Sequence, residues 1–68
     1  MIEYKIDVLN ALKEKGYSSY KIQQDNLLSQ SSLTKLRRGQ AVNISTLNTI
    51  CMLLDCQPGD VIKFVRQD

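Results

Sequence analysis

Residues 18–39, SSYKIQQDNLLSQSSLTKLRRG, show the pattern of two short helices joined by a tight turn. Ser19 is placed to cap the first helix and Ser29 to cap the second, because a serine hydroxyl accepts a hydrogen bond from a free N–H of the first turn. Apolar residues at helical spacing form the expected inner side: Ile22, Leu28, Leu33 and Leu36. Residues 19–39 are therefore predicted to form a helix-turn-helix whose second helix is exposed.

The second helix, expected over residues 29–38, has two different sides. At about 100° per residue, Leu33 and Leu36 point inward. The outward side and its flank are polar and basic and carry no acidic residue: Gln30, Ser31, Thr34, Lys35 and Arg38. A merely solvated face more often mixes both signs of charge, so this one favours an anionic partner over the solvated-helix alternative. The major groove of B-DNA admits such a helix, and the candidate base-reading residues are Gln30, Ser31, Thr34 and Lys35.

The charge distribution is more informative than the net charge, which is only +2. Residues 20–43 carry four cations against Asp25 alone and have a net charge of +3, whereas residues 1–19 sum to zero and residues 44–68 to −1. The excess of positive charge therefore lies on the predicted helix-turn-helix, where a phosphate backbone would lie.

The segments SQSSLTKLRRG and, further along, STLNTICMLLDCQPGD occur in the order and spacing of the Xre/Cro-type repressors of phages and bacteria, which this chain resembles over most of its length. The chain departs from the family pattern at Gln23, where many members have alanine, and at Leu27, where many have glycine. The resemblance implies a single all-α domain over residues 1–68, lambda-repressor-like, with four to five short helices. It also implies contacts to the DNA backbone from Tyr20, Lys21, Gln40 and Asn43, although Tyr20 could equally be a packing residue. Ser19, Arg37 and Arg38 are expected to hold or steer the phosphates as well.

The remaining segments are expected to complete this small core. Residues 6–15 are predicted to form a helix that ends at Gly16. Val42 and Ile44 are expected to anchor the next loop, and Ser45 to cap a helix over residues 46–54. Pro58 suits the first position of a last short helix, with Asp60 stabilising its first turn. Beyond it lies an apolar set that fills the core in part, with the rest left for a homodimer seam or a strand pairing with the start of the chain: Val61, Ile62, Phe64 and Val65.

Composition narrows the function classes. The chain has no histidine, so histidine-based catalysis and Cys/His zinc sites are excluded, and Cys51 and Cys56 are predicted to be small buried hydrophobes. We expect no enzyme, cofactor or metal, and no membrane association, in a cytoplasmic protein bound to the nucleoid. The expected function is sequence-specific binding of double-stranded DNA by a transcriptional regulator, which the family analogy makes a repressor. The alternative is a protein-interaction module, such as an antitoxin or adaptor, on the same scaffold.

Overall fold

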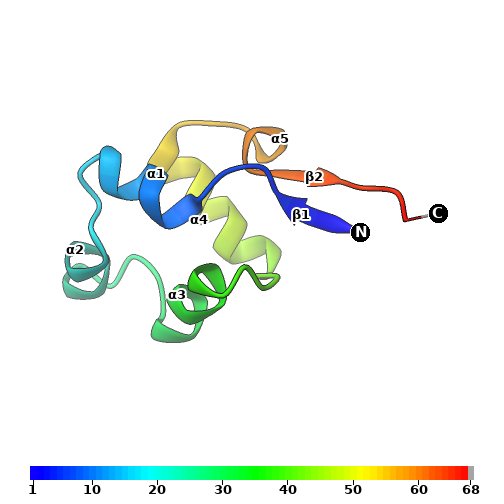
Figure 1. The fold of residues 1–68 in the computed structure, drawn as a ribbon. Helices are drawn as coiled ribbons and strands as arrows, with labels where there is room; N and C mark the ends of the chain where they lie inside the picture. The colour runs from blue at the N-terminus through cyan, green and yellow to red at the C-terminus, as the bar shows by residue number, and fades with distance from the viewer. Residues whose placement is uncertain (68) are drawn as a thin grey trace.

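The computed structural model describes residues 1–67, which form five helices and a two-stranded sheet (Figure 1). The elements follow one another as β1 (Ile2–Tyr4), α1 (Val8–Glu14), α2 (Ser19–Gln24), α3 (Gln30–Arg37), α4 (Ile44–Leu54), α5 (Pro58–Val61) and β2 (Ile62–Phe64). In Figure 1, α2 and α3 lie along the lower side of the molecule, and the sheet projects to the right.

Every helix contributes to one apolar core. Leu12, Ile22 and Leu33 are fully buried, as are Ile50 and Val61. Leu28 in the turn between α2 and α3 joins the same cluster. The inward positions predicted for the helix-turn-helix are thus confirmed, with Leu36 half-buried at the edge. Each large-to-Ala change at a fully buried leucine or isoleucine here is expected to cost about 2–5 kcal/mol of stability.

The predicted helical fold is confirmed, but the chain is not purely all-α, because its two ends pair as antiparallel strands. Ile2 lies opposite Phe64, Glu3 opposite Lys63 and Tyr4 opposite Ile62. Apolar and charged residues alternate along each strand, and this period of two gives each strand one apolar face. In a short helix, residues two apart would not share a face. The sequence left two alternatives for the apolar C-terminus, a homodimer seam or a strand paired with the start of the chain, and the strand pairing is confirmed.

Side chains that cap the helices set where each begins, and two caps differ from the prediction. Ser18, not Ser19, caps α2: its Oγ accepts from the Lys21 N–H at 3.2 Å, and Ser19 is already helical. Ser29 caps α3 as predicted, with its Oγ 3.1 Å from the Ser32 nitrogen. Because the Asn43 side chain accepts from the Thr46 N–H at 2.7 Å, α4 starts two residues before the predicted position and Ser45 lies inside it.

The shift at α4 also moves a residue expected in the core. Ile44 becomes the first residue of the helix and is 84% exposed, so it does not anchor the loop, whereas Val42 is half-buried. The predicted end of α1 and the predicted first turn of α5 are confirmed. Gly16 has a φ of 93°, as expected for the residue that ends α1, and Asp60 accepts from the Gln57 N–H at 3.0 Å to close the first turn of α5.

We predict that Asn43→Ala lowers the free energy of unfolding by about 1 kcal/mol, because it removes the side-chain cap of α4. Ser45→Ala is the matched control and should change stability by no more than about 0.5 kcal/mol, since Ser45 is an exposed residue within the helix. Urea denaturation followed by circular dichroism measures both. Equal losses for the two variants would contradict the assignment of Asn43 as the cap.

Candidate nucleic-acid interface

Burial of the inner side of α3 fixes the direction in which its outward side faces. Leu33 is fully buried, and the Ser32 hydroxyl lies 3.2 Å from that of Thr46, which links α3 to α4. This leaves Gln30, Ser31 and Lys35 exposed on the far side of the helix. Three of the four predicted base-reading residues therefore have free side-chain surface.

Thr34 is the exception among the four. It is half-buried, and its hydroxyl donates to the carbonyl oxygen of Gln30 at 3.0 Å. A threonine bonded back to its own helix in this way has used its only hydroxyl hydrogen. Its oxygen and its methyl group remain for a partner, so Thr34 is limited to accepting a hydrogen bond or making an apolar contact.

Gln23 is a part of this surface that the sequence analysis missed. Its side-chain Nε2 donates to Oε1 of Gln30 at 2.7 Å, across the turn from α2 to α3. The contact depends on the angle between the two helices, and no periodicity of the sequence reports that angle. The glutamine thus bridges the two helices from their exposed side.

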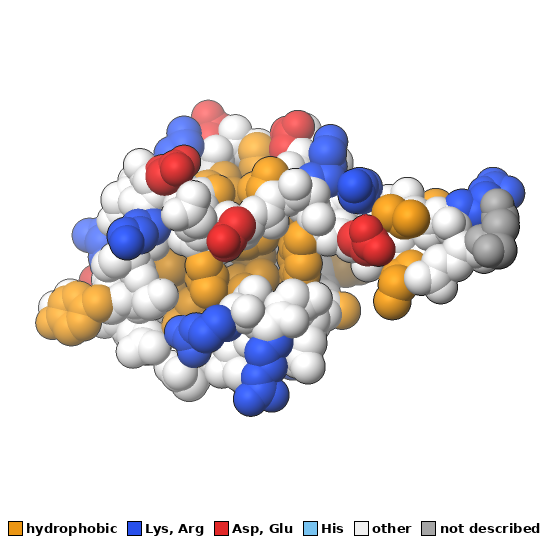
Figure 2. Space-filling view, in the orientation of Figure 1, with side chains coloured by type: hydrophobic (Ala, Val, Ile, Leu, Met, Phe, Trp, Pro, Cys, Tyr) orange, Lys and Arg blue, Asp and Glu red, His pale blue; other side chains and the backbone are white. Residues whose placement is uncertain are grey.

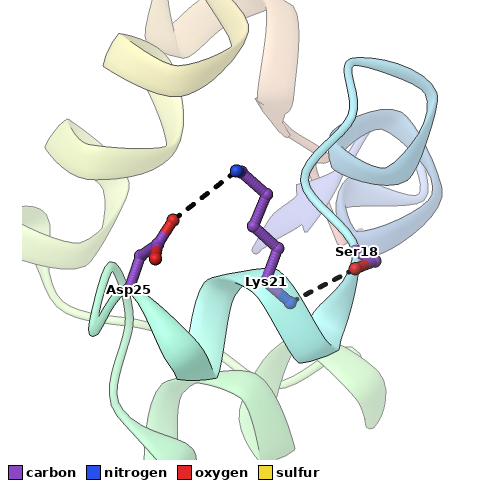
Figure 3. Close-up of polar contacts among 3 residues, drawn as sticks. All are labelled: Ser18, Lys21 and Asp25. Atoms are coloured by element: carbon purple, nitrogen blue, oxygen red, sulfur yellow. Dashed lines mark hydrogen bonds and ion pairs between the residues drawn. The ribbon is translucent and has the colours of Figure 1, made fainter.

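The start of α2 presents a second group of candidate side chains. Tyr20 is 75% exposed, whereas Ser19 is half-buried. Lys21 forms an ion pair with Asp25, with 3.7 Å between Nζ and Oδ2, and both side chains are about half exposed (Figure 3). Such an exposed i,i+4 pair is worth only a few tenths of a kcal/mol, so Lys21 can exchange Asp25 for another anion at little cost.

The basic residues at the end of α3 are free of acidic partners within the described part of the chain. Lys35, Arg37 and Arg38 are exposed, and the ion pair of Lys21 is the only one among residues 1–67. Figure 2 shows Lys and Arg side chains, with no acidic group beside them, on the lower side of the molecule, where α3 lies in Figure 1. Arg37 also lines a shallow hollow with Ser19, Lys13 of α1 and Asp7, which caps α1.

The loop after α3 is fixed at both ends. The Tyr4 hydroxyl of β1 donates to the carbonyl oxygen of Gln40 at 2.6 Å, and burial raises the pKa of this hydroxyl above its usual value, which keeps the donor protonated. At the other end, Asn43 uses its side-chain oxygen to cap α4. The amide N–H groups of Asn43 stay available, and these are the groups that donate to a phosphate. Gln40 is exposed as well.

The candidate site thus has exposed polar side chains of α3 at its centre. The predicted backbone-contacting residues come from α2, the end of α3 and the loop that follows, and all of them are exposed except Ser19. Within residues 1–67, no three His, Cys, Asp or Glu side chains come together as a metal site. In the same part of the chain, no helix has the length and apolar character needed to cross a bilayer.

Comparison with known proteins agrees with this geometry. The family model described as the Cro/C1-type HTH DNA-binding domain matches residues 5–67. A curated protein of Bacillus subtilis (strain 168), named "Uncharacterized HTH-type transcriptional regulator YozG", is 30% identical over 59 residues, which cover 87% of this chain and 70% of that protein. No solved structure matches the chain significantly. The family match spans nearly the whole helical body, and the chain belongs to the Cro/C1-type family of helix-turn-helix DNA-binding domains.

Proposed function

We propose that this protein is a transcriptional regulator, acting as a repressor, that binds a specific DNA sequence with α3 in the major groove. The observation that carries the proposal is the exposed, acid-free side of α3, which the buried Leu33 holds in place. Arg37 and Arg38 border it and form no ion pair with any of residues 1–67. The relative from Bacillus subtilis, which is named a transcriptional regulator, supports the same function. A helix in the major groove meets base edges with its outward side and phosphates with its ends.

Gln30 is the residue to which we assign the most specific base contact. Its Oε1 accepts from Gln23, which leaves both amide hydrogens of Gln30 and one further acceptor position on its oxygen free. Adenine offers an acceptor at N7 and a donor at N6 in the major groove, which complements that combination. We therefore propose that Gln30 contacts an adenine and that Gln23 holds the Gln30 amide in the orientation required.

We predict that Gln30→Ala weakens binding to the cognate site by about 1–3 kcal/mol and leaves binding to random duplex unchanged. Gln23→Ala should lose a smaller part of the same preference, at the same base pair, because Gln30 remains but is no longer oriented. Gln24→Ala is the matched control, since Gln24 is an exposed glutamine of α2. Gel-shift titrations on the fragment upstream of the gene, with single-base variants and random competitor, measure all three.

Two results would count against this assignment. Equal losses on cognate and random DNA would remove the base-reading role from Gln30. An absence of any binding to duplex DNA would instead favour the alternative of a protein-interaction module on this scaffold, for which the exposed apolar part of the sheet is the surface to examine.

We predict that Arg38→Ala weakens binding to every duplex and lowers the slope of log K against log salt concentration by about one, because one phosphate contact is lost. Lys63→Ala removes the same charge from β2, away from α3 in Figure 1, and serves as the control. Fluorescence anisotropy at several salt concentrations gives both slopes. An identical slope change for the two variants would indicate a general effect of net charge.

A dimer through the apolar C-terminus is proposed in a narrower form than the sequence suggested. Val61 is fully buried and cannot belong to a seam, and Ile62 and Val65 are half-buried. The exposed pair is Phe64, 67% exposed, with its cross-strand neighbour Ile2, 59% exposed. Both lie on the apolar face of a sheet that has only two strands and hence two free edges, a feature that favours association with another chain.

We predict that Phe64→Glu shifts the protein from dimer to monomer and weakens binding to a two-half-site operator without changing binding to a single half-site. Two copies on adjacent half-sites bind more tightly only when they contact each other. Met52→Glu is the control, because Met52 is equally exposed on α4, outside the sheet. Sedimentation equilibrium measures the mass. An unchanged mass for Phe64→Glu would move the interface elsewhere.

A further inference from the structure

The last turn of α4 brings the two cysteines of the chain together. Asp55 adopts a left-handed conformation, with φ 53° and ψ 54°. The Cys56 N–H donates to the Cys51 carbonyl oxygen at 3.0 Å, and the Asp55 N–H donates to that of Met52 at 3.4 Å. These are the two bonds of a Schellman motif, in which the side chains at the positions of Cys51 and Cys56 meet across the helix end.

The two thiols are both in contact and accessible. Each cysteine is half-buried, and neither is in a disulfide. Both also line the same shallow hollows at the surface, beside Asn48 and Gln57. The contact usual at this point of a Schellman motif is between two apolar side chains, and leucine or valine would supply it equally well. Two thiols add a chemical capacity that the packing does not require.

This pair lies apart from the proposed DNA-binding surface. Figure 1 shows that α4 starts beside the end of α3 and runs away from it, so the last turn of α4, which holds the cysteines, lies at the end far from α3. No hydrogen bond or ion pair in the described part of the chain links Gln30, Lys35 or Arg38 to either cysteine. A modification at the pair is therefore independent of the proposed function and can be tested whether or not the protein binds DNA.

We propose that Cys51 and Cys56 form a covalent modification site, at which a low-molecular-weight disulfide oxidises the two thiols to one intramolecular disulfide. In the first step, one cysteine gives up its proton and its thiolate attacks the oxidant, which forms a mixed disulfide and releases one small thiolate. In the second step, the other cysteine attacks the protein sulfur of the mixed disulfide and releases the second small thiolate. The two protons from the protein end on the two released thiols, and the two electrons reduce the oxidant.

The surroundings of the pair govern the rate of this reaction. Burial raises the pKa of the Cys56 thiol, and Cys51, Asp60 and Asp55 raise it further. Because the thiolate is the attacking species, a raised pKa slows the step in which Cys56 attacks.

The experiment equilibrates the purified full-length protein with buffers of oxidised and reduced glutathione, followed by an acid quench, alkylation and mass spectrometry. We expect one product, a monomer lighter than the reduced protein by two hydrogen atoms, whose digest contains a peptide pair linked between Cys51 and Cys56. The equilibrium constant for oxidation by glutathione should fall by at least about tenfold when the same buffers contain enough urea to unfold the chain. The reason is that the unfolded motif no longer holds the two thiols together.

The matched control moves one thiol by a single residue. In the double variant Cys56→Ser, Gln57→Cys, the second thiol lies just outside the motif, at an exposed position. It should give mainly glutathione adducts or linked dimers. Circular dichroism verifies that the double variant is folded. A second control, Cys51→Ser, retains one native thiol and should give a single glutathione adduct. The proposal is overturned if the natural protein accumulates two adducts or linked dimers, or if the double variant closes its disulfide as readily.

Discussion

The burial of Leu33 is the constraint on which the candidate interface depends. An isolated helix of eight residues is not stable in water, so α3 exists only because its inner side is packed. Leu33 supplies that packing, the Ser29 cap satisfies the first turn, and the hydroxyl contact between Ser32 and Thr46 fixes the rotation of α3 against α4. Because the inner side of α3 is packed against the core, the opposite side of the helix faces solvent. The burial of Leu33 therefore exposes Gln30 and Lys35.

The two departures from the family pattern have structural explanations. In the turn between α2 and α3, the left-handed position falls on Asn26, with a φ of 57°, and asparagine adopts that conformation more readily than most residues. Leu27 has no positive φ, and as a half-buried residue packed against the core it needs none. Gln23 is exposed, so its size does not force the helices apart, and its amide instead joins them through Gln30. Both replacements are thus compatible with the usual motif.

The parts of the fold that the sequence predicted are those set by local periodicity. The helices around Ile22, Leu33 and Ile50 follow from apolar spacing, and their existence is confirmed. The starts of α2 and α4 were misplaced by one and two residues, because adjacent polar residues such as Ser18 and Ser19 are equivalent in sequence and only the backbone conformation selects the cap. The sheet was harder to foresee, since Ile2 and Phe64 become neighbours only after every helix between them has packed. The partner of Gln30 depends in the same way on an interhelical angle.

The sheet does more than join the chain ends, because it also reaches the candidate interface. Tyr4 of β1 bonds the carbonyl oxygen of Gln40, in the loop that follows α3, while Ile2 of the same strand belongs to the proposed dimer surface. Only one residue separates Ile2 from Tyr4, and cross-strand pairing with β2 makes the segment stiffer than a single extended chain. A second copy bound at Ile2 and Phe64 would therefore be held at a fixed orientation relative to the loop and α3. In the proposed dimer, this orientation would determine the spacing of the two half-sites, and the short hydrogen bond from Tyr4 to Gln40 would then couple the ends of the chain to the choice of operator.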